Sequence, residues 1–180
     1  MSDIKVLGLV GSVRAASVNR QIAELAAETA PDGIDITVFE GLGDLPFYNE
    51  DIDGEDTPAS VVALRRAAAD ADAALVVTPE SNGSIPGVLK NAIDWLSRPF
   101  GNSDLKDKPL AVIGAAGGQY GGVWAHDETR KSFGFAGPRV VESIKLSVPV
   151  KSFDGKHPRE SAEMVDNLRD MLGKLAAEVG

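Results

Sequence analysis

Five short apolar segments alternate with five amphipathic segments along this chain of 180 residues. The apolar segments have the length of strands, and the segments between them carry apolar residues at helical spacings. Strands are expected at residues 5–10, 35–39, 73–78, 110–114 and 140–146, and helices at residues 18–30, 58–71, 86–98, 120–135 and 158–178. Regular β–α alternation with right-handed crossovers is typical of a parallel sheet. The sequence therefore predicts an α/β fold with helices on both faces of the sheet.

The number of strands narrows the topology further. Five parallel strands favour the flavodoxin-like order 2-1-3-4-5, a three-layer sandwich whose switch point lies between strands 1 and 3. Ligands of such sheets bind outside the carboxyl ends of the strands at that point. The chain is long enough to bury one core and shows no internal repeat or linker. We therefore expect one domain spanning residues 1–180.

The turn after the first predicted strand is rich in hydrogen-bond donors. Ser12, Ser17 and Asn19 contribute hydroxyl and amide groups, and Arg14 contributes a charged fork. The helix that follows adds its dipole and its unpaired N–H groups, which favour an anion. Neither G-x-G-x-x-G nor Gly-Lys-Ser/Thr is present. The turn suits the terminal phosphate of a mononucleotide better than a bridging pyrophosphate, and an ordinary βα turn with a serine cap is the alternative.

Two further unusual turns follow the third and fourth predicted strands. The first, at residues 79–84, passes through Asn82 and Gly83, and the second contains Gly117 and Gly118 within a glycine-rich stretch. Glycine permits backbone conformations closed to other residues and lets a ligand approach the main chain closely. The alternative for the glycine-rich stretch is a merely flexible loop. Three such turns at neighbouring strand ends predict one site for a flat ligand with polar edges.

Composition excludes several classes of protein. The absence of cysteine rules out disulfides, thiolate metal sites and thiol nucleophiles, and a net charge of −9 argues against nucleic acid as the main partner. An acidic cluster at residues 50–56 lacks the spacing of a calcium-binding loop and is interpreted as solvated. No apolar run approaches the roughly 20 residues of a membrane span, and no signal-peptide pattern is present. A cytoplasmic location is the prediction.

Few side chains suggest acid–base or metal chemistry. His126 and His157 are interpreted as surface or capping histidines, because no partner motif for a hydrolase or a metal accompanies them. Trp95 is interpreted, like Trp124, as a core or interface residue. The aromatic pair at residues 47–48 lies in a long irregular stretch and is a candidate for the wall of a pocket.

Three segments resemble the NAD(P)H-dependent FMN reductase family, whose members include quinone, chromate and azo-dye reductases. Residues 11–19 look like its G-S-x-R-x-x-S-x-N phosphate loop, and residues 79–95 are similar to its P-E-Y-N-x-S-x-P-G-x-L-K-N-A-I-D-W segment. Residues 45–51 resemble the loop that flanks the flavin. The resemblance covers nearly the whole chain. It departs at Ser81, where the family has tyrosine, and this change bears on FMN affinity and acceptor range rather than on the fold.

The resemblance implies that FMN is held non-covalently by the three turns. The first turn would surround the phosphate, the backbone of Asn82 and Gly83 would face the N5/O4 edge of the ring, and the glycine-rich turn would approach the ring closely. The implied cofactor-binding residues are Ser12, Arg14, Ser17, Val18, Asn19, Pro79, Glu80, Ser81, Asn82, Gly83, Ser84, Gly117 and Gly118. No catalytic side chain and no metal ligand are implied, because FMN would carry the chemistry.

The resemblance also implies an oxidoreductase. Hydride would pass from NADPH or NADH to FMN and then, by a ping-pong mechanism, to a small-molecule acceptor that is quinone-like, an azo compound, chromate or free flavin. A homodimer or homotetramer is expected, with neither nucleic acid nor membrane insertion. Two alternatives remain at this stage: a flavodoxin-type FMN electron carrier, and a flavin-free binding module, for which Ser81 is the only support.

Overall fold

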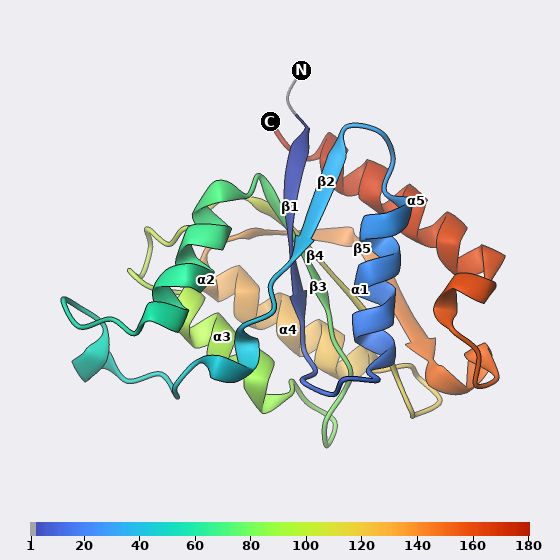
Figure 1. Cartoon of the computed structure of the whole chain (residues 1–180), viewed down its shortest axis with the longest axis horizontal. Coiled ribbons are helices and arrows are strands. Elements are labelled where there is room, and N and C mark those ends of the chain that lie inside the picture. The colour runs from blue at the N-terminus through green and yellow to red at the C-terminus, as the bar shows by residue number, and fades with distance from the viewer. Residues whose placement is uncertain (1–2) are drawn as a thin grey trace.

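The computed structural model describes residues 3–180 (Figure 1). The strands are β1 (Ile4–Val10), β2 (Ile34–Val38), β3 (Ala73–Val77), β4 (Pro109–Ala116) and β5 (Arg139–Pro149). The α-helices are α1 (Val18–Thr29), α2 (Ala59–Asp70), α3 (Gly87–Leu96), α4 (Val123–Ala136) and α5 (Ala162–Ala177). Short 3₁₀ helices occupy η1 (Leu42–Asp44), η2 (Glu50–Ile52), η3 (Val150–Phe153) and η4 (Pro158–Glu160). The predicted number and order of strands and α-helices are confirmed.

The five strands form one parallel sheet in the order β2-β1-β3-β4-β5. This is the predicted flavodoxin-like order, with β1 and β3 adjacent at its switch point. In Figure 1 β1 and β2 run downward, and because all strands are parallel the loops after them gather toward the lower end of the molecule. The turns after β1, β3 and β4 therefore meet at one edge of the sheet.

Helices cover both faces of the sheet, and the strands supply residues to both sides. On β3, Leu75 and Val77 point into the core beneath α1 and α5, whereas Val76 points into the core beneath α2, α3 and α4. Successive side chains of a strand alternate between its faces, so a strand buried on both sides has to be apolar throughout. This explains why the apolar runs in the sequence mark the central strands.

Three predicted boundaries differ from those observed by three residues or more. The glycine-rich turn extends to Gly122, whose φ of +93° is left-handed, and α4 begins only after it. The predicted last helix is divided, because residues 158–160 form a separate 3₁₀ turn and Ser161 then caps α5 by accepting a hydrogen bond from Met164 N at 3.2 Å. Strand β5 continues to Pro149, three residues beyond the predicted end, and this extension carries the chain toward the site.

Among the described residues, no helix combines the length and the apolar character that crossing a membrane requires.

Candidate functional site

A cleft of about 590 Å³ opens at the carboxyl ends of β1, β3 and β4. The turns after these strands form its wall, together with the start of α3 and one residue after β5. The lining residues are Gly11, Ser12, Val13, Arg14, Ser17, Val18, Asn19, Pro79, Glu80, Ser81, Pro86, Gly87, Val88, Ala115, Ala116, Gly117 and Val150. A smaller hollow of about 380 Å³ between β2 and α2 contains none of the predicted site residues. The structure thus brings the three predicted turns together.

Most of the predicted site residues line this cleft, and four do not. Asn82, Gly83, Ser84 and Gly118 are absent from its wall, although each lies close in sequence to a residue that forms it. Their contact with a cofactor remains a prediction. The prediction named Val18 and Pro79 but missed other apolar residues of the wall, among them Val13 and Val150. No feature of the sequence marked Val150, because β5 was expected to end earlier.

The turn after β1 keeps several donors free on the cleft side. Ser17 caps α1 by accepting a hydrogen bond from Arg20 N at 3.3 Å, while the N–H groups of the first helical turn cannot be paired inside the helix. The exposed Arg14 guanidinium has one intramolecular hydrogen bond in the described residues, to the Ala16 carbonyl at 3.3 Å. This end of the cleft therefore offers positive charge and unpaired N–H groups, a combination that binds an anion.

Asn19 is placed differently from its neighbours in this turn. Its side chain is buried, its Nδ2 donates to the Ala115 carbonyl at 2.8 Å, and its Oδ1 accepts from Ala115 N at 2.8 Å. These two bonds connect the first turn of α1 to the end of β4. With its side chain engaged in this way, Asn19 would reach a phosphate through its backbone N–H.

The turn after β3 is a preformed two-residue hairpin. Ser81 N donates to the Ser84 carbonyl and Ser84 N donates to the Ser81 carbonyl, each at 3.0 Å. The two residues between them, Asn82 and Gly83, have φ values of +53° and +74°, as a type I′ turn requires. We refer to residues 79–84 as the hairpin.

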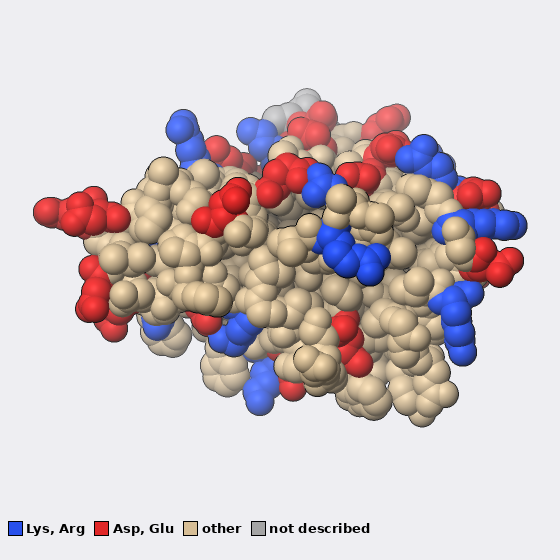
Figure 2. All heavy atoms as spheres, turned by 60° about the horizontal axis from the view of Figure 1, so that its bottom comes forward, with Lys and Arg blue, Asp and Glu red and all other residues tan. Residues whose placement is uncertain are grey.

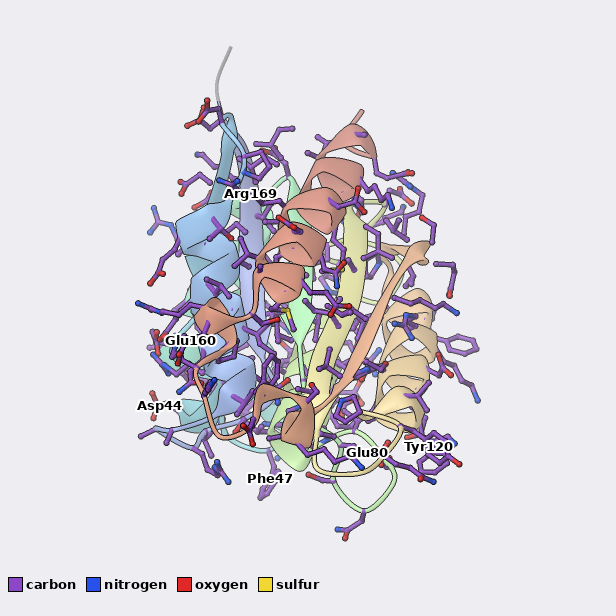
Figure 3. All side chains as sticks on the ribbon, turned by 90° about the vertical axis from the view of Figure 1, so that its right-hand side faces the viewer. Asp44, Phe47, Glu80, Tyr120, Glu160 and Arg169 are labelled. Carbon is purple, nitrogen blue, oxygen red and sulfur yellow. The ribbon has the colours of Figure 1, made fainter. Side chains whose placement is uncertain are left out.

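The hairpin is also attached to α4. The Glu80 carboxylate accepts a hydrogen bond from Ala125 N at 3.3 Å, and the Ser84 hydroxyl donates to the Glu128 carboxylate. The first of these bonds supplies a cap to the N-terminus of α4, because Gly122 at the N-cap position has no side chain to do so. Figure 3 shows Glu80 at the same end of the molecule as Tyr120, which precedes that helix.

Bare backbone also lines part of the cleft. A Cβ atom added to Gly87 or Gly117 would meet no atom within 4 Å, and both residues belong to the wall. A side chain at either position would project into open space that a ligand can use. A flat group can therefore approach the main chain here.

The interpretation of His126 as a surface or capping residue is wrong. It is fully buried in α4, with Nε2 at 2.8 Å from the Thr78 carbonyl and Nδ1 at 2.7 Å from Ser147 Oγ. Burial is the main cause that lowers the pKa of His126 below its ordinary value. The ring is therefore neutral at pH 7. Adjacency to Asp127 suggested exposure, but the polar space that receives the imidazole is created by tertiary packing.

The remaining aromatic and histidine interpretations have mixed outcomes. Trp95 is buried, as expected, and Tyr48 packs edge-on against it with ring centroids 4.9 Å apart. Phe47 is 88% exposed and points away from the body of the molecule in Figure 3. Neither Phe47 nor Tyr48 lines the cleft, although this pair was a candidate for the wall of a pocket. Trp124 is half exposed and contacts Tyr120. His157 is a capping residue, with Nδ1 accepting from Arg159 N at 3.1 Å.

Charges of both signs surround the loops that form the cleft. Figure 2 turns the lower end of the molecule toward the viewer, and its basic and acidic side chains are interspersed with broad uncharged areas. The face shown there has no extended basic surface of the kind that nucleic acids require. Within residues 3–180, no group of His, Asp and Glu is arranged to hold a metal ion.

Comparison with known proteins agrees with this geometry. The sequence model of one family, NADPH-dependent FMN reductase, matches residues 4–152. The chain is 44% identical over 136 residues to a quinone reductase of Pseudomonas putida, covering 75% of this chain and 73% of that protein. The chain belongs to the NADPH-dependent FMN reductase family.

Two further proteins extend the similarity over the full length. A quinone reductase of Escherichia coli strain K12 is 32% identical over 177 residues, which cover 97% of this chain and 93% of that protein. The solved structure of FerB, a flavoenzyme NAD(P)H:acceptor oxidoreductase from Paracoccus denitrificans, superimposes with a TM-score of 0.80 at 30% identity, covering 98% and 95% of the two chains. The chain is thus an oxidoreductase that uses FMN and NAD(P)H.

The residues of the cleft fit an FMN molecule. One end carries the anion-binding turn after β1, and the other combines the hairpin with the open backbone at Gly117. The Glu80 carboxylate belongs to the hairpin end of the wall, where it caps α4. A phosphate at the first end and a flat ring at the second match the polarity of the wall.

Proposed function

We propose that this chain transfers hydride from NAD(P)H to FMN held in the cleft and from there to a quinone-like acceptor. An azo compound, chromate or free flavin is the alternative acceptor that we propose for the same open site. The observation that carries the proposal is the convergence of three turns on one cleft, with an anion-binding end and an end of bare backbone. The quinone reductases to which the chain is similar support the class of acceptor.

In this proposal the turn after β1 binds the phosphate. Arg14 supplies the charge, Ser12 supplies a hydroxyl, and the start of α1 supplies N–H groups and the positive end of its dipole. Ser17 holds the turn in place as the cap of α1. The resident cofactor supplies the capacity to accept and donate hydride, so the protein needs no acid–base pair of its own.

The hairpin and the glycine-rich turn orient the ring. The backbone of Asn82 and Gly83 would present N–H groups to its polar edge, while Gly117 lets the main chain lie close to it. Ser81 leaves space beside the ring that a tyrosine would fill. We expect this space to broaden the range of acceptors, because a larger part of the ring face stays accessible.

One cleft would serve both the nicotinamide and the acceptor, so the two substrates would bind in turn. The order of events would be ping-pong, with the oxidised nucleotide leaving before the acceptor binds. Initial rates measured at several fixed concentrations of a benzoquinone should give parallel lines in double-reciprocal plots. Intersecting lines would indicate a ternary complex and would contradict this part of the proposal.

The first test is the visible absorption spectrum of the purified protein with and without NADPH under anaerobic conditions. Flavin bands that bleach on addition of NADPH and return on addition of a benzoquinone support the proposal. Bands that persist would indicate an electron carrier served by a partner protein. A protein that takes up no FMN on reconstitution would mean that the site at Ser81 has lost its cofactor.

We also propose a homo-oligomer, either a dimer or a tetramer. Phe100 and Phe135 are 72% and 73% exposed, and both line a groove of about 230 Å³ between α3 and α4. Large exposed aromatic side chains of this kind favour burial against another surface. Sedimentation velocity of the intact chain would show a single monomeric species if this proposal is wrong. The cytoplasmic location remains a prediction from the sequence.

A further inference from the structure

The hydrogen-bond ladder between β3 and β4 opens where the cleft begins. Thr78 N donates to the Ile113 carbonyl at 3.0 Å, so a continued parallel ladder would pair Ala115 N–H with the Thr78 carbonyl. Instead, Ala115 N donates to Asn19 Oδ1 at 2.8 Å, and the Thr78 carbonyl lies 2.8 Å from His126 Nε2. Two side chains therefore replace one backbone hydrogen bond at the point where the strands separate.

The groups that surround Gly114 of β4 leave no room for a side chain at this position. A Cβ atom added to Gly114 would lie 2.0 Å from the Thr78 carbonyl oxygen, 2.8 Å from Asn19 Oδ1 and 2.9 Å from His126 Nε2. The Thr78 carbonyl, the Asn19 amide and the His126 imidazole thus pack together against the backbone of Gly114. The direction of the Thr78 carbonyl is fixed by this packing.

The surroundings of His126 select one tautomer. A carbonyl oxygen only accepts hydrogen bonds, so Nε2 carries the proton and Nδ1 accepts the hydroxyl proton of Ser147. Burial lowers the pKa of the ring, and the positive charge of Arg130 acts in the same direction. The carboxylates of Glu80 and Asp127 and the hydrogen bond to Thr78 act in the opposite direction and are outweighed. The ring is therefore a fixed neutral donor toward β3.

The hairpin begins one residue beyond the carbonyl that His126 holds. Pro79 follows Thr78, and its ring fixes φ, so a rotation of the peptide at Thr78 is passed on to the hairpin. The contacts of Glu80 with Ala125 N and of Ser84 with Glu128 join the same helix, α4. Helix α4 therefore contacts the residue before the hairpin, through His126, and one residue on each side of its turn, Glu80 and Ser84.

We propose that His126 is a positioning residue for FMN, which sets the angle at which the hairpin leaves β3 and thus the position of its backbone against the cofactor. This inference rests on the proposed function. It assigns to the buried imidazole a role in cofactor affinity that goes beyond holding the fold together. No proton transfer by His126 is involved.

The test uses three variants of the full chain. His126→Leu removes the donor to the Thr78 carbonyl, whereas His126→Gln keeps one donor and one acceptor at similar reach. His157→Asn changes the other histidine of the chain and replaces it with a residue that can also cap η4. Each apoprotein is first shown to be folded by circular dichroism and thermal unfolding. The dissociation constant of FMN is then measured by quenching of flavin fluorescence.

We expect His126→Leu to weaken FMN binding about tenfold. A change of this size corresponds to the loss of one hydrogen bond to a buried carbonyl, if the loss destabilises the hairpin geometry that binds FMN. His126→Gln and His157→Asn should stay within about twofold of the unaltered chain. A His126→Leu protein that melts at a lower temperature but binds FMN with unchanged affinity would overturn the inference, since the imidazole would then be only structural.

A second measurement keeps the inference testable if His126→Leu does not fold. In the His157→Asn protein His126 is the only histidine, so ¹⁵N–¹H spectra of its ring need no assignment. We expect a slowly exchanging proton on Nε2 and a shift of its resonance when FMN binds. A proton on Nδ1, or a resonance that FMN leaves unchanged, would overturn the inference. Failure of the unaltered chain to bind FMN would instead overturn the proposed function.

Discussion

The turn after β1 and the hairpin after β3 face the same cleft, but the first keeps its donors free whereas the second uses its polar groups to fix itself. Arg14 has a single hydrogen bond to its own turn and extends into solvent. The hairpin closes on itself through Ser81 and Ser84 and is held by α4 at Glu80. The turn after β1 therefore has donors available for a charged group, whereas the hairpin has its shape without a ligand.

The contrast fits the chemistry that the proposed function assigns to each region. A phosphate is a compact anion, which flexible charged side chains and helix N–H groups can surround after it arrives. A ring edge needs donors at fixed positions, and a preformed turn avoids the entropy cost of ordering them on binding. Side-chain substitutions should therefore matter most after β1, and backbone substitutions after β3.

The largest effect is expected from Gly114→Ala, which forces apart the strands that support the hairpin. The added Cβ would meet the Thr78 carbonyl at 2.0 Å, and backbone atoms cannot move aside as a flexible side chain can. We expect a loss of about 3 kcal/mol or more in the free energy of unfolding, measured by urea denaturation. Gly134→Ala is the matched control, because that glycine lies inside α4 with nothing near its Cβ position.

The control should move in the opposite direction. Alanine is a better helix former than glycine, so Gly134→Ala should stabilise the protein by about 0.5–1 kcal/mol. Equal unfolding midpoints for the two variants would show that β3 and β4 tolerate a side chain between them. Close packing around Gly114 would then not be what holds the two strands in place.

The next largest effect is expected from Arg14→Ala, which removes the free charge of the first turn. Loss of a charge-assisted hydrogen bond to a phosphate should raise the dissociation constant of FMN roughly 10- to 100-fold, with little change in stability. The measurement is a fluorescence titration at low and high salt, because the Arg14 contribution should decrease as salt increases.

Arg20→Ala is the control for charge alone. The Arg20 guanidinium is hydrogen-bonded to Glu40 and Glu24, and these contacts, led by the one to Glu40, raise its pKa. Its charge is therefore already paired, and FMN affinity should change by no more than about twofold. If both variants lost affinity equally, the net charge of the region rather than the position of Arg14 would determine binding.

The sequence was sufficient to predict that the three turns meet at one cleft. Three unusual turns followed buried strands, and the carboxyl ends of neighbouring parallel strands share an edge, so the convergence of Ser12, Glu80 and Gly117 followed from topology alone. The β-strand order was predictable for the same reason. Local patterns of apolar and turn residues contain this information because each strand is buried on both faces.

The sequence was insufficient where tertiary packing decides what a polar side chain does. Asn19 belongs to the motif of the first turn, yet its amide pairs with Ala115, which is 96 residues away in the chain. His126 shows no periodicity or motif that marks it as buried, because the polar space it occupies exists only where β3 and β4 diverge. Val150 entered the wall through an extension of β5 that no turn residue signalled.

A smaller effect is expected from Gly83→Ala, which strains the hairpin without touching its neighbours. Gly83 has a φ of +74°, and nothing lies within 4 Å of its Cβ position, so the cost is conformational and about 1 kcal/mol. FMN affinity should fall about fivefold, and the hairpin amides should exchange faster with solvent. Gly54→Ala lies in another loop with open space and no left-handed φ, and it should leave both measurements unchanged.

The smallest effect concerns the pH dependence of stability in the region that supports the hairpin. His126 is neutral in the folded chain because its pKa is lowered from the ordinary value of 6.5, mainly by burial. Below pH 6.5 the unfolded chain binds a proton that the folded chain does not, so stability present at higher pH is lost as the pH falls toward the folded pKa. Urea denaturation of the unaltered chain between pH 7.5 and 5.5 should therefore show a larger loss of stability than His126→Gln, which lacks the titrating ring. Parallel profiles would mean that the pKa of His126 is not lowered in the folded protein.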